Sequence, residues 1–178
     1  MTELRDTVVD TIRRIAAGSD ETIDRSLLQE WMRADDLVAL GGVYYMLFDG
    51  RFNRRIVPPL TLDDYLDFTL PYYGRCFRED PDLPYASPRY TAGWDLASWF
   101  KKLWRDPAVP RDALRRIKSW LAETYKDAND DVRQAIVTAT LEHLFEDKGV
   151  RQFFGDWKEA PVLGTAYAEA INVPDSSS

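Results

Sequence analysis

The chain has 178 residues, a length that suits one domain with a sizeable core. Its hydrophobic content of 45% and aromatic content of 13% exclude disorder for the bulk of the chain. The formal net charge of −7 disfavours nucleic acid and anionic membranes as partners and favours a basic protein.

The cysteine count and the apolar runs indicate the compartment. Cys76 is the only cysteine, which excludes an intrachain disulfide and favours a reducing environment. The N-terminus is charged and has no apolar signal segment. The longest apolar run, 37–48, is shorter than the ~20 residues that span a bilayer. We therefore expect a cytoplasmic protein with no membrane partner.

The first 31 residues are predicted to form two amphipathic helices, because their apolar residues recur at the helical period. Gly18 ends the first helix, and Ser19 or Asp20 begins the second. The side chains expected to point inward are Leu4, Val8, Ile12 and Ile15 in the first helix, and Ile23, Leu27, Leu28 and Trp31 in the second.

The apolar run 37–48 has two interpretations. Gly41-Gly42 fits the turn of a β-hairpin between two apolar strands. Alternatively, Asp35 or Asp36 caps a buried helix. The strict alternation of a half-buried hairpin is missing, so the helix is favoured.

Residues 51–91 are predicted to contain connectors and helices in alternation. A connector with two prolines is predicted at 51–60, and Thr61 with Asp64 forms a near capping box that begins a helix. Pro71 either kinks that helix or begins a new one. The segment 81–91 holds three prolines and is the longest connection, so it is the best loop candidate for a functional role.

Residues 129–148 are predicted to form a helix that is apolar almost all round. Asn129 or Asp130 caps its start, and Gly149 is the left-handed residue that follows its last turn. The polar side chains form one narrow stripe, made of Gln134, Thr138, Glu142 and Glu146. Such a helix must be buried against several neighbours, so we expect it at the centre of the fold.

The segments on either side of this helix are also predicted to be helical. The pattern at 94–104 predicts a helix with an aromatic face, and Pro110 sits at the first position of a strongly amphipathic helix. After the central helix, 150–157 predicts a short turn or helix, and 161–171 a final helix with a proline at its first position.

Together the elements predict an all-α protein. We expect a compact bundle of about seven to nine helices around the buried helix 129–148. A single domain is predicted over 1–173, and 174–178 are predicted to form a disordered tail.

His143 is the only histidine, so protease-like or metal chemistry would have to use it. Glu142 and Glu146 lie close to it in sequence, but the two-histidine metalloprotease and zinc-finger spacings are absent. We interpret His143 as a partly buried residue at the edge of the core, hydrogen-bonded to a neighbour. No catalytic, metal or cofactor-binding residue is predicted; a small enzyme using His143 or a pair of carboxylates is the alternative.

Most of the other residues that could take part in catalysis or metal binding are interpreted as structural. Asp127, Asn129 and Asp131 mimic the start of a calcium loop but lack its glycine and final glutamate, so they are interpreted as helix caps. Cys76 is interpreted as a small core residue. A basic run is interpreted as a solvated helix face or as a complement to the protein's own acidic surface: Lys101, Lys102, Arg105, Arg111, Arg115, Arg116 and Lys118. The acidic residues that could supply a catalytic pair are Asp63, Asp64, Asp67, Glu79, Asp80 and Asp82.

Three stretches resemble uncharacterised, mostly helical bacterial proteins: VYYMLFDGRF at 43–52, WDLASWFKKLW at 94–104 and LEHLFED at 141–147. Some acidic proteins of that kind serve as immunity partners of toxins. The resemblance implies a non-enzymatic bacterial protein-binding module of toxin-neutralising or regulatory type. It carries no functional residue across.

A partner would bind through the aromatic-rich middle of the chain. Tyrosine, tryptophan and arginine are enriched among the residues that dominate binding energy. We predict that Tyr85, Tyr90, Asp80 and Asp82 contact a basic protein that the net negative charge attracts. The alternative is that the aromatic residues belong to the core and that the acidity only keeps the protein soluble. The oligomeric state has no signal in the sequence.

Overall fold

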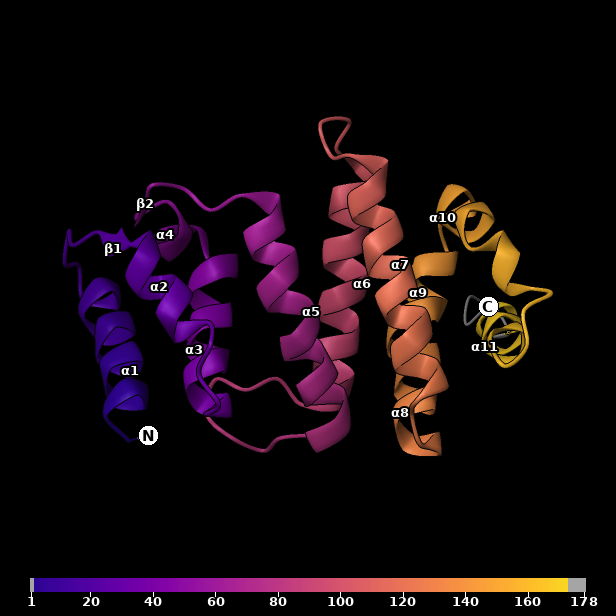
Figure 1. The fold of residues 1–178 in the computed structure, drawn as a ribbon, viewed down its shortest axis with the longest axis horizontal. Coiled ribbons are helices and arrows are strands. Elements are labelled where there is room, and N and C mark those ends of the chain that lie inside the picture. The colour runs from indigo at the N-terminus through magenta and orange to yellow at the C-terminus, as the bar shows by residue number, and fades with distance from the viewer. Residues whose placement is uncertain (1, 173–178) are drawn as a thin grey trace, which may run out of the picture. The chain divides into compact units, whose positions relative to one another are not determined.

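A computed structural model describes residues 2–172 of the chain (Figure 1). The chain divides into two compact units. The first unit comprises Met1–Tyr72 and Pro81–Ser87, and the second comprises Tyr73–Asp80 and Pro88–Ser178. The single domain over 1–173 stays a prediction, and the predicted tail at 174–178 lies outside the described residues.

The chain is all-α, as the sequence predicts. Residues 2–172 form ten helices when the consecutive segments α8 (Asp130–Ala135), η1 (Ile136–Leu141) and α9 (Glu142–Phe145) are taken as one. Eight of the ten have at least seven residues, in agreement with the predicted seven to nine.

In the first unit, α1 and α2 both contact α3, which lies at the centre of this unit (Figure 1). A short pair of parallel strands joins the segments after α1 and α4. The elements are α1 (Thr2–Ala16), β1 (Ile23–Asp24), α2 (Arg25–Trp31), α3 (Leu37–Phe48), α4 (Gly50–Asn53), β2 (Ile56–Val57) and the part of α5 (Leu62–Glu79) that precedes Tyr73.

The prediction for the second helix is wrong at its start. The helix α2 begins at Arg25 instead of Ser19 or Asp20, because the Asp24 carboxylate is the group that accepts two first-turn N–H bonds, at 2.8 and 3.0 Å. Leu27 points outward instead of inward and is 42% exposed.

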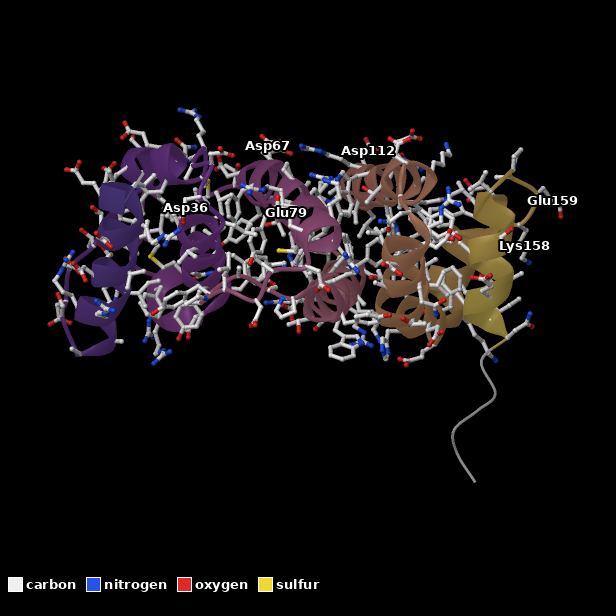
Figure 2. The ribbon with its side chains drawn as sticks, turned by 90° about the horizontal axis from the view of Figure 1, so that it is seen from below. Asp36, Asp67, Glu79, Asp112, Lys158 and Glu159 are labelled. Atoms are coloured by element: carbon white, nitrogen blue, oxygen red, sulfur yellow. The ribbon has the colours of Figure 1, made fainter. Side chains whose placement is uncertain are left out.

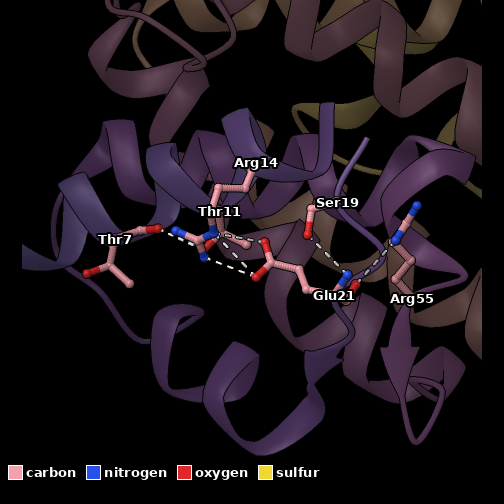
Figure 3. Close-up of polar contacts among 6 residues, drawn as sticks. All are labelled: Thr7, Thr11, Arg14, Ser19, Glu21 and Arg55. Atoms are coloured by element: carbon pink, nitrogen blue, oxygen red, sulfur yellow. Dashed lines mark hydrogen bonds and ion pairs between the residues drawn. The ribbon is translucent and has the colours of Figure 1, made fainter. Parts of the chain in front are cut away.

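Gly18 ends α1 as predicted, with φ +100°, and a polar cluster then holds the chain that follows it (Figure 3). The Arg14 Nε donates to the Glu21 carboxylate at 3.1 Å, and its Nη2 donates to Thr11 Oγ1 at 3.2 Å. The Glu21 N–H donates to Ser19 Oγ, and Arg55 donates to the Glu21 carbonyl oxygen. The segment is thereby held between α1 and the residue before β2.

The ambiguous apolar run is the helix α3 and not a hairpin. Asp36 caps it by accepting a first-turn N–H at 2.8 Å. A Cβ on Gly41 would lie 2.4 Å from the carbonyl oxygen of Tyr85, and one on Gly42 would lie 2.6 Å from the Val8 side chain. The glycine pair therefore serves close packing and does not form a turn.

The predicted connector at 51–60 is wrong in part, because α4 extends into it and β2 lies within it. The capping box is confirmed: the Thr61 N–H donates to Asp64 Oδ2 at 2.7 Å, and the Asp64 N–H donates to Thr61 Oγ1 at 3.2 Å. Pro71 lies inside α5, which is one helix, so it does not begin a new one.

The second unit holds the last part of α5 and the remaining helices. They are α6 (Arg89–Arg105), α7 (Arg111–Lys126), α8, η1, α9, α10 (Lys148–Phe153), the 3₁₀ turn η2 (Gly155–Trp157) and α11 (Leu163–Ile171). Two predicted starts are wrong. The helix α6 begins before 94, and α11 begins after Pro161 because Val162 has φ +67°, outside the helical region.

The helix predicted at 129–148 is buried as expected and is the core of the second unit. Asn129 caps it by accepting an N–H bond at 3.0 Å. Its middle, η1, is π-helical: the Glu142 N–H donates to the carbonyl oxygen of Val137, five residues earlier. The segment η1 contacts α6 and α11.

The end of this helix differs from the prediction. It ends at Phe145, and the Asp147 carboxylate then caps α10 by accepting the N–H of Gly149 at 2.8 Å. Gly149 therefore lies in the next helix and is not the left-handed terminator expected from the sequence.

A glycine brings α6 close to η1. A Cβ on Gly93 would lie 2.6 Å from the Cβ of Ala139, and the Gly93 carbonyl oxygen accepts a hydrogen bond from Thr140 Oγ1 at 3.1 Å. The two helices are therefore locked side by side, and this arrangement shapes the groove described below.

Candidate functional site

Most of the net negative charge of the protein belongs to the first unit. That unit holds fourteen Asp and Glu residues against eight Arg, a difference of −6. The described part of the second unit, 73–80 and 88–172, holds fifteen acidic and fifteen basic residues. Figure 2 labels Asp36 and Asp67 among the acidic side chains of the first unit, and the oppositely charged neighbours Lys158 and Glu159 in the second. Over the described residues the excess negative charge therefore lies in the first unit.

Two aromatic pairs lie along α3, and we call their four residues the Tyr85 surface: Tyr45, Phe48, Tyr65 and Tyr85. Tyr45 and Phe48 are three residues apart in α3 and so share a face. The ring centroids of Tyr45 and Tyr85 are 6.1 Å apart, and those of Phe48 and Tyr65 are 5.9 Å apart. Phe48 is 37% exposed and Tyr85 is 38% exposed. The acidic unit thus presents aromatic rings to solvent.

The backbone at Tyr85 is held in the left-handed region, with φ +65°. For a residue with a side chain this conformation costs about 1–2 kcal/mol. Its carbonyl group packs on the bare backbone of Gly41, and two residues later the N–H of Ser87 donates to the buried Tyr72 hydroxyl at 3.0 Å. The fold therefore fixes the loop in a conformation that leaves the Tyr85 ring exposed.

An ion pair lies at the rim of this surface. Arg51 Nη2 donates to the Tyr45 hydroxyl at 2.7 Å and to Asp49 Oδ2 at 2.8 Å. The hydrogen bond from the Arg51 side chain is the main cause that lowers the pKa of Asp49 from 3.8 to about 2. The rim is therefore ionised and paired at neutral pH.

We expect NMR titration of the Asp49 carboxyl carbon to show a midpoint near pH 2. Because the folded-state pKa is lowered, the pair stabilises the fold fully above the unfolded value of 3.8, and this contribution is lost as the pH falls to about 2. Asp49→Asn keeps a capping side chain but loses the charge. Its free energy of unfolding should be lower than that of the unaltered protein by less than about 1 kcal/mol at pH 7, and this difference should vanish near pH 2. An ordinary midpoint near 3.8 would contradict the pairing.

The four predicted partner-binding residues are divided between the units. Tyr85 and the exposed Asp82 belong to the first unit, and Tyr90 and Asp80 belong to the second. Tyr90 lies in the first turn of α6, so the predicted loop at 81–91 is too long by three residues. Asp80 accepts the backbone N–H of the residue before Tyr90 at 2.8 Å, which gives it a structural role at the start of α6.

A groove runs along α6 and α9 in the second unit, and we call it the α6–α9 groove. It has a volume of about 420 Å³. Its lining residues are Trp94, Ala97, Ser98, Lys101 and His143. Trp94 is 51% exposed, and its ring lies 6.5 Å from that of Tyr90. The sequence places Trp94 on the apolar face of a helix, and only the packing of α6 on η1 shows that its ring faces solvent.

One carboxylate joins the polar groups of this groove. Glu146 accepts from Lys101 Nζ at 2.9 Å through Oε2, and its Oε1 lies 3.2 Å from His143 Nδ1. The hydrogen bond from Lys101 is the main cause that lowers the pKa of Glu146, whereas burial raises the pKa of Glu142. His143 is half-buried and bonded to a neighbour, in agreement with the sequence interpretation.

A second hollow, of about 260 Å³, lies between α2 and α5 in the first unit. Asp64 and Asp67 line it. Burial favours a higher pKa for Asp64, but hydrogen bonds from Thr61 and Gln29 outweigh it, so the net pKa is lowered. The general acid of a glycosidase needs a raised pKa, so Asp64 does not suit that role.

The remaining candidates have structural surroundings. Cys76 is fully buried, which agrees with a core role. In the basic run, Lys101, Arg115 and Lys118 pair with acidic residues of the same unit. Over residues 2–172 no group of three His, Cys, Asp or Glu side chains could hold a metal ion.

No protein-family model, curated protein or solved structure matches this chain. Among the described helices, none combines the length and the apolar character needed to cross a membrane.

Proposed function

We propose that this protein is a non-enzymatic binding module of the bacterial cytoplasm, of immunity or regulatory type, that binds a basic protein through the Tyr85 surface. The observation that carries the proposal is the exposure of Phe48 and Tyr85 on the unit that holds the excess negative charge. Exposed aromatic rings supply the short-range anchors typical of interfaces. The surrounding charge supplies attraction at longer range.

The fixed conformation of the loop that carries Tyr85 supports the proposed binding surface. A ring presented on a pre-set backbone loses little conformational entropy on binding, so more of the contact energy appears as affinity. Packing of the Tyr85 carbonyl group on Gly41 holds the left-handed backbone, while the Tyr85 side chain stays exposed. Strain of this kind persists where the surrounding structure enforces it and is found at binding sites.

Co-purification from the native cell should yield a basic protein. Its capture should weaken between low salt and ~0.15 M salt, because the screening length falls to about 8 Å. The association rate should fall more than the dissociation rate rises, since steering acts on encounter. Capture of an acidic partner, or capture indifferent to salt, would contradict the charge argument.

Two matched variants locate the site. Tyr85→Ala should weaken the complex by about 2 kcal/mol or more and leave the melting temperature nearly unchanged, because the ring is an exposed anchor. Tyr90→Ala removes a tyrosine of similar exposure, 42%, from the second unit, whose described residues have balanced charge, and should leave affinity intact. If Tyr90→Ala weakens the complex and Tyr85→Ala does not, the partner binds the second unit instead.

A small enzyme is the second candidate, favoured by one observation. His143 is bonded to the Glu146 carboxylate, and Ser98 lines the same groove, which resembles a carboxylate–imidazole–hydroxyl arrangement. However, the described residues show no hydrogen bond between Ser98 and His143. The groove walls are helix interiors whose backbone N–H groups are bonded within the helices, so no backbone N–H is available there as an oxyanion donor.

Hydrolysis of a nitrophenyl ester separates the two candidates. We expect no turnover above the rate given by His143→Ala. A saturable activity that is lost in both His143→Ala and Ser98→Ala would establish the enzyme.

A further inference from the structure

The α6–α9 groove holds a donor pair that already binds a carboxylate. Lys101 and His143 come from different helices, and both contact the Glu146 carboxylate. The Lys101 side chain is only 21% exposed, whereas that of Glu146 is 62% exposed. The ammonium group is therefore held in the groove wall, and the carboxylate that occupies it is the more solvent-exposed partner.

The rest of the groove suits a flat apolar group. Trp94 exposes half of its surface beside the small side chain of Ala97. Indole rings stack on other aromatic rings with a gain beyond the area that they bury. The volume of about 420 Å³ falls in the range of small-molecule sites.

We propose that the α6–α9 groove binds a small aromatic carboxylate, whose ring stacks on Trp94 and whose carboxylate replaces that of Glu146 at Lys101 and His143. Without ligand, the Glu146 carboxylate occupies the position that the carboxylate of the ligand takes. Its ion pair is exposed enough to exchange at low cost, because such pairs contribute little net stability. The second unit has balanced charge over its described residues, so its field does not oppose an anion.

Phenylacetate is a suitable probe, with phenylacetamide as the neutral match. Ligand-observed NMR should show saturable binding of phenylacetate and none of phenylacetamide. Glu146→Gln removes the competing charge and should raise the affinity for phenylacetate by about twofold to fivefold. Lys101→Met should lower it by about tenfold, because a charge-assisted hydrogen bond is lost.

Lys102→Met is the matched control, since Lys102 is the exposed neighbour of Lys101 and does not line the groove. It should bind phenylacetate like the unaltered protein. Trp94→Ala should weaken binding without lowering the melting temperature. Unchanged melting temperatures show that the variants are folded.

Three outcomes overturn the proposal. The first is that neither the unaltered protein nor Glu146→Gln binds phenylacetate. The second is that Lys101→Met and Lys102→Met weaken binding equally, which would indicate a non-specific charge effect. The third is binding of a tripeptide that ends in phenylalanine without binding of phenylacetate, which would make the groove a peptide site.

Discussion

Ile136→Asp is expected to lower the free energy of unfolding by about 3–5 kcal/mol, because it places an unpaired carboxylate at a fully buried position. Ile136 begins the π-helical segment, which contacts α6 and α11. A loss of this size is a large share of the stability of a typical domain. Urea unfolding followed by circular dichroism measures it.

The pH dependence identifies the mechanism. Burial should raise the folded-state pKa of the introduced carboxyl above its unfolded value, so the destabilisation should grow as the pH rises and shrink near pH 4. Thr138→Asp adds the same group within the same segment at a half-exposed position. Thr138→Asp should lower the free energy of unfolding by only about 1 kcal/mol or less. Equal effects of the two variants would show that this segment is not the core of the second unit.

Gly41→Ala is expected to destabilise the protein, although the same change in an ordinary helix gains about 1 kcal/mol. The added Cβ would lie 2.4 Å from the Tyr85 carbonyl oxygen and 2.8 Å from the Ala86 nitrogen, and backbone atoms cannot turn away as side chains do. Relief requires α3 and the loop to separate. We expect a loss of about 1–3 kcal/mol, as for other overpacked sites.

Gly50→Ala is the matched control, because no atom lies within 4 Å of its Cβ position and its φ is not positive. It should leave the melting temperature unchanged or raise it slightly. Under the proposed function, Gly41→Ala should also weaken partner binding, since the displaced loop carries Tyr85. A Gly41→Ala protein as stable as Gly50→Ala would mean that the loop does not pack on α3.

The two surfaces have different chemistry, and each lies within one unit. The Tyr85 surface combines exposed rings with an excess of acidic groups. The α6–α9 groove combines an exposed indole with an ammonium group, an imidazole and a carboxylate. We propose a basic macromolecule as the partner of the first surface and a small anion as the ligand of the second. Their tests use different probes and different residues, so one proposal can fail while the other stands.

The sequence by itself determined the all-α class and most of the helices, because those features depend on local interactions. Helical periodicity marks the apolar faces, and caps satisfy N–H groups a few residues away. Asp36, Asn129 and the Thr61–Asp64 box were predictable for this reason. The burial of the central helix followed from its narrow polar stripe, and the structure confirms it.

Only the tertiary structure decided the features that depend on contacts between distant segments. Gly41-Gly42 also fits a turn in sequence, because the loop backbone that explains Gly41 is more than forty residues away. The exposure of Trp94 depends on how α6 meets η1, and the pairing of Lys101 with Glu146 spans 45 positions. The net charge was known from composition, but the concentration of most of it in the first unit was not. A helix pattern shows which face is apolar, whereas packing between segments decides which rings and charges stay at the surface.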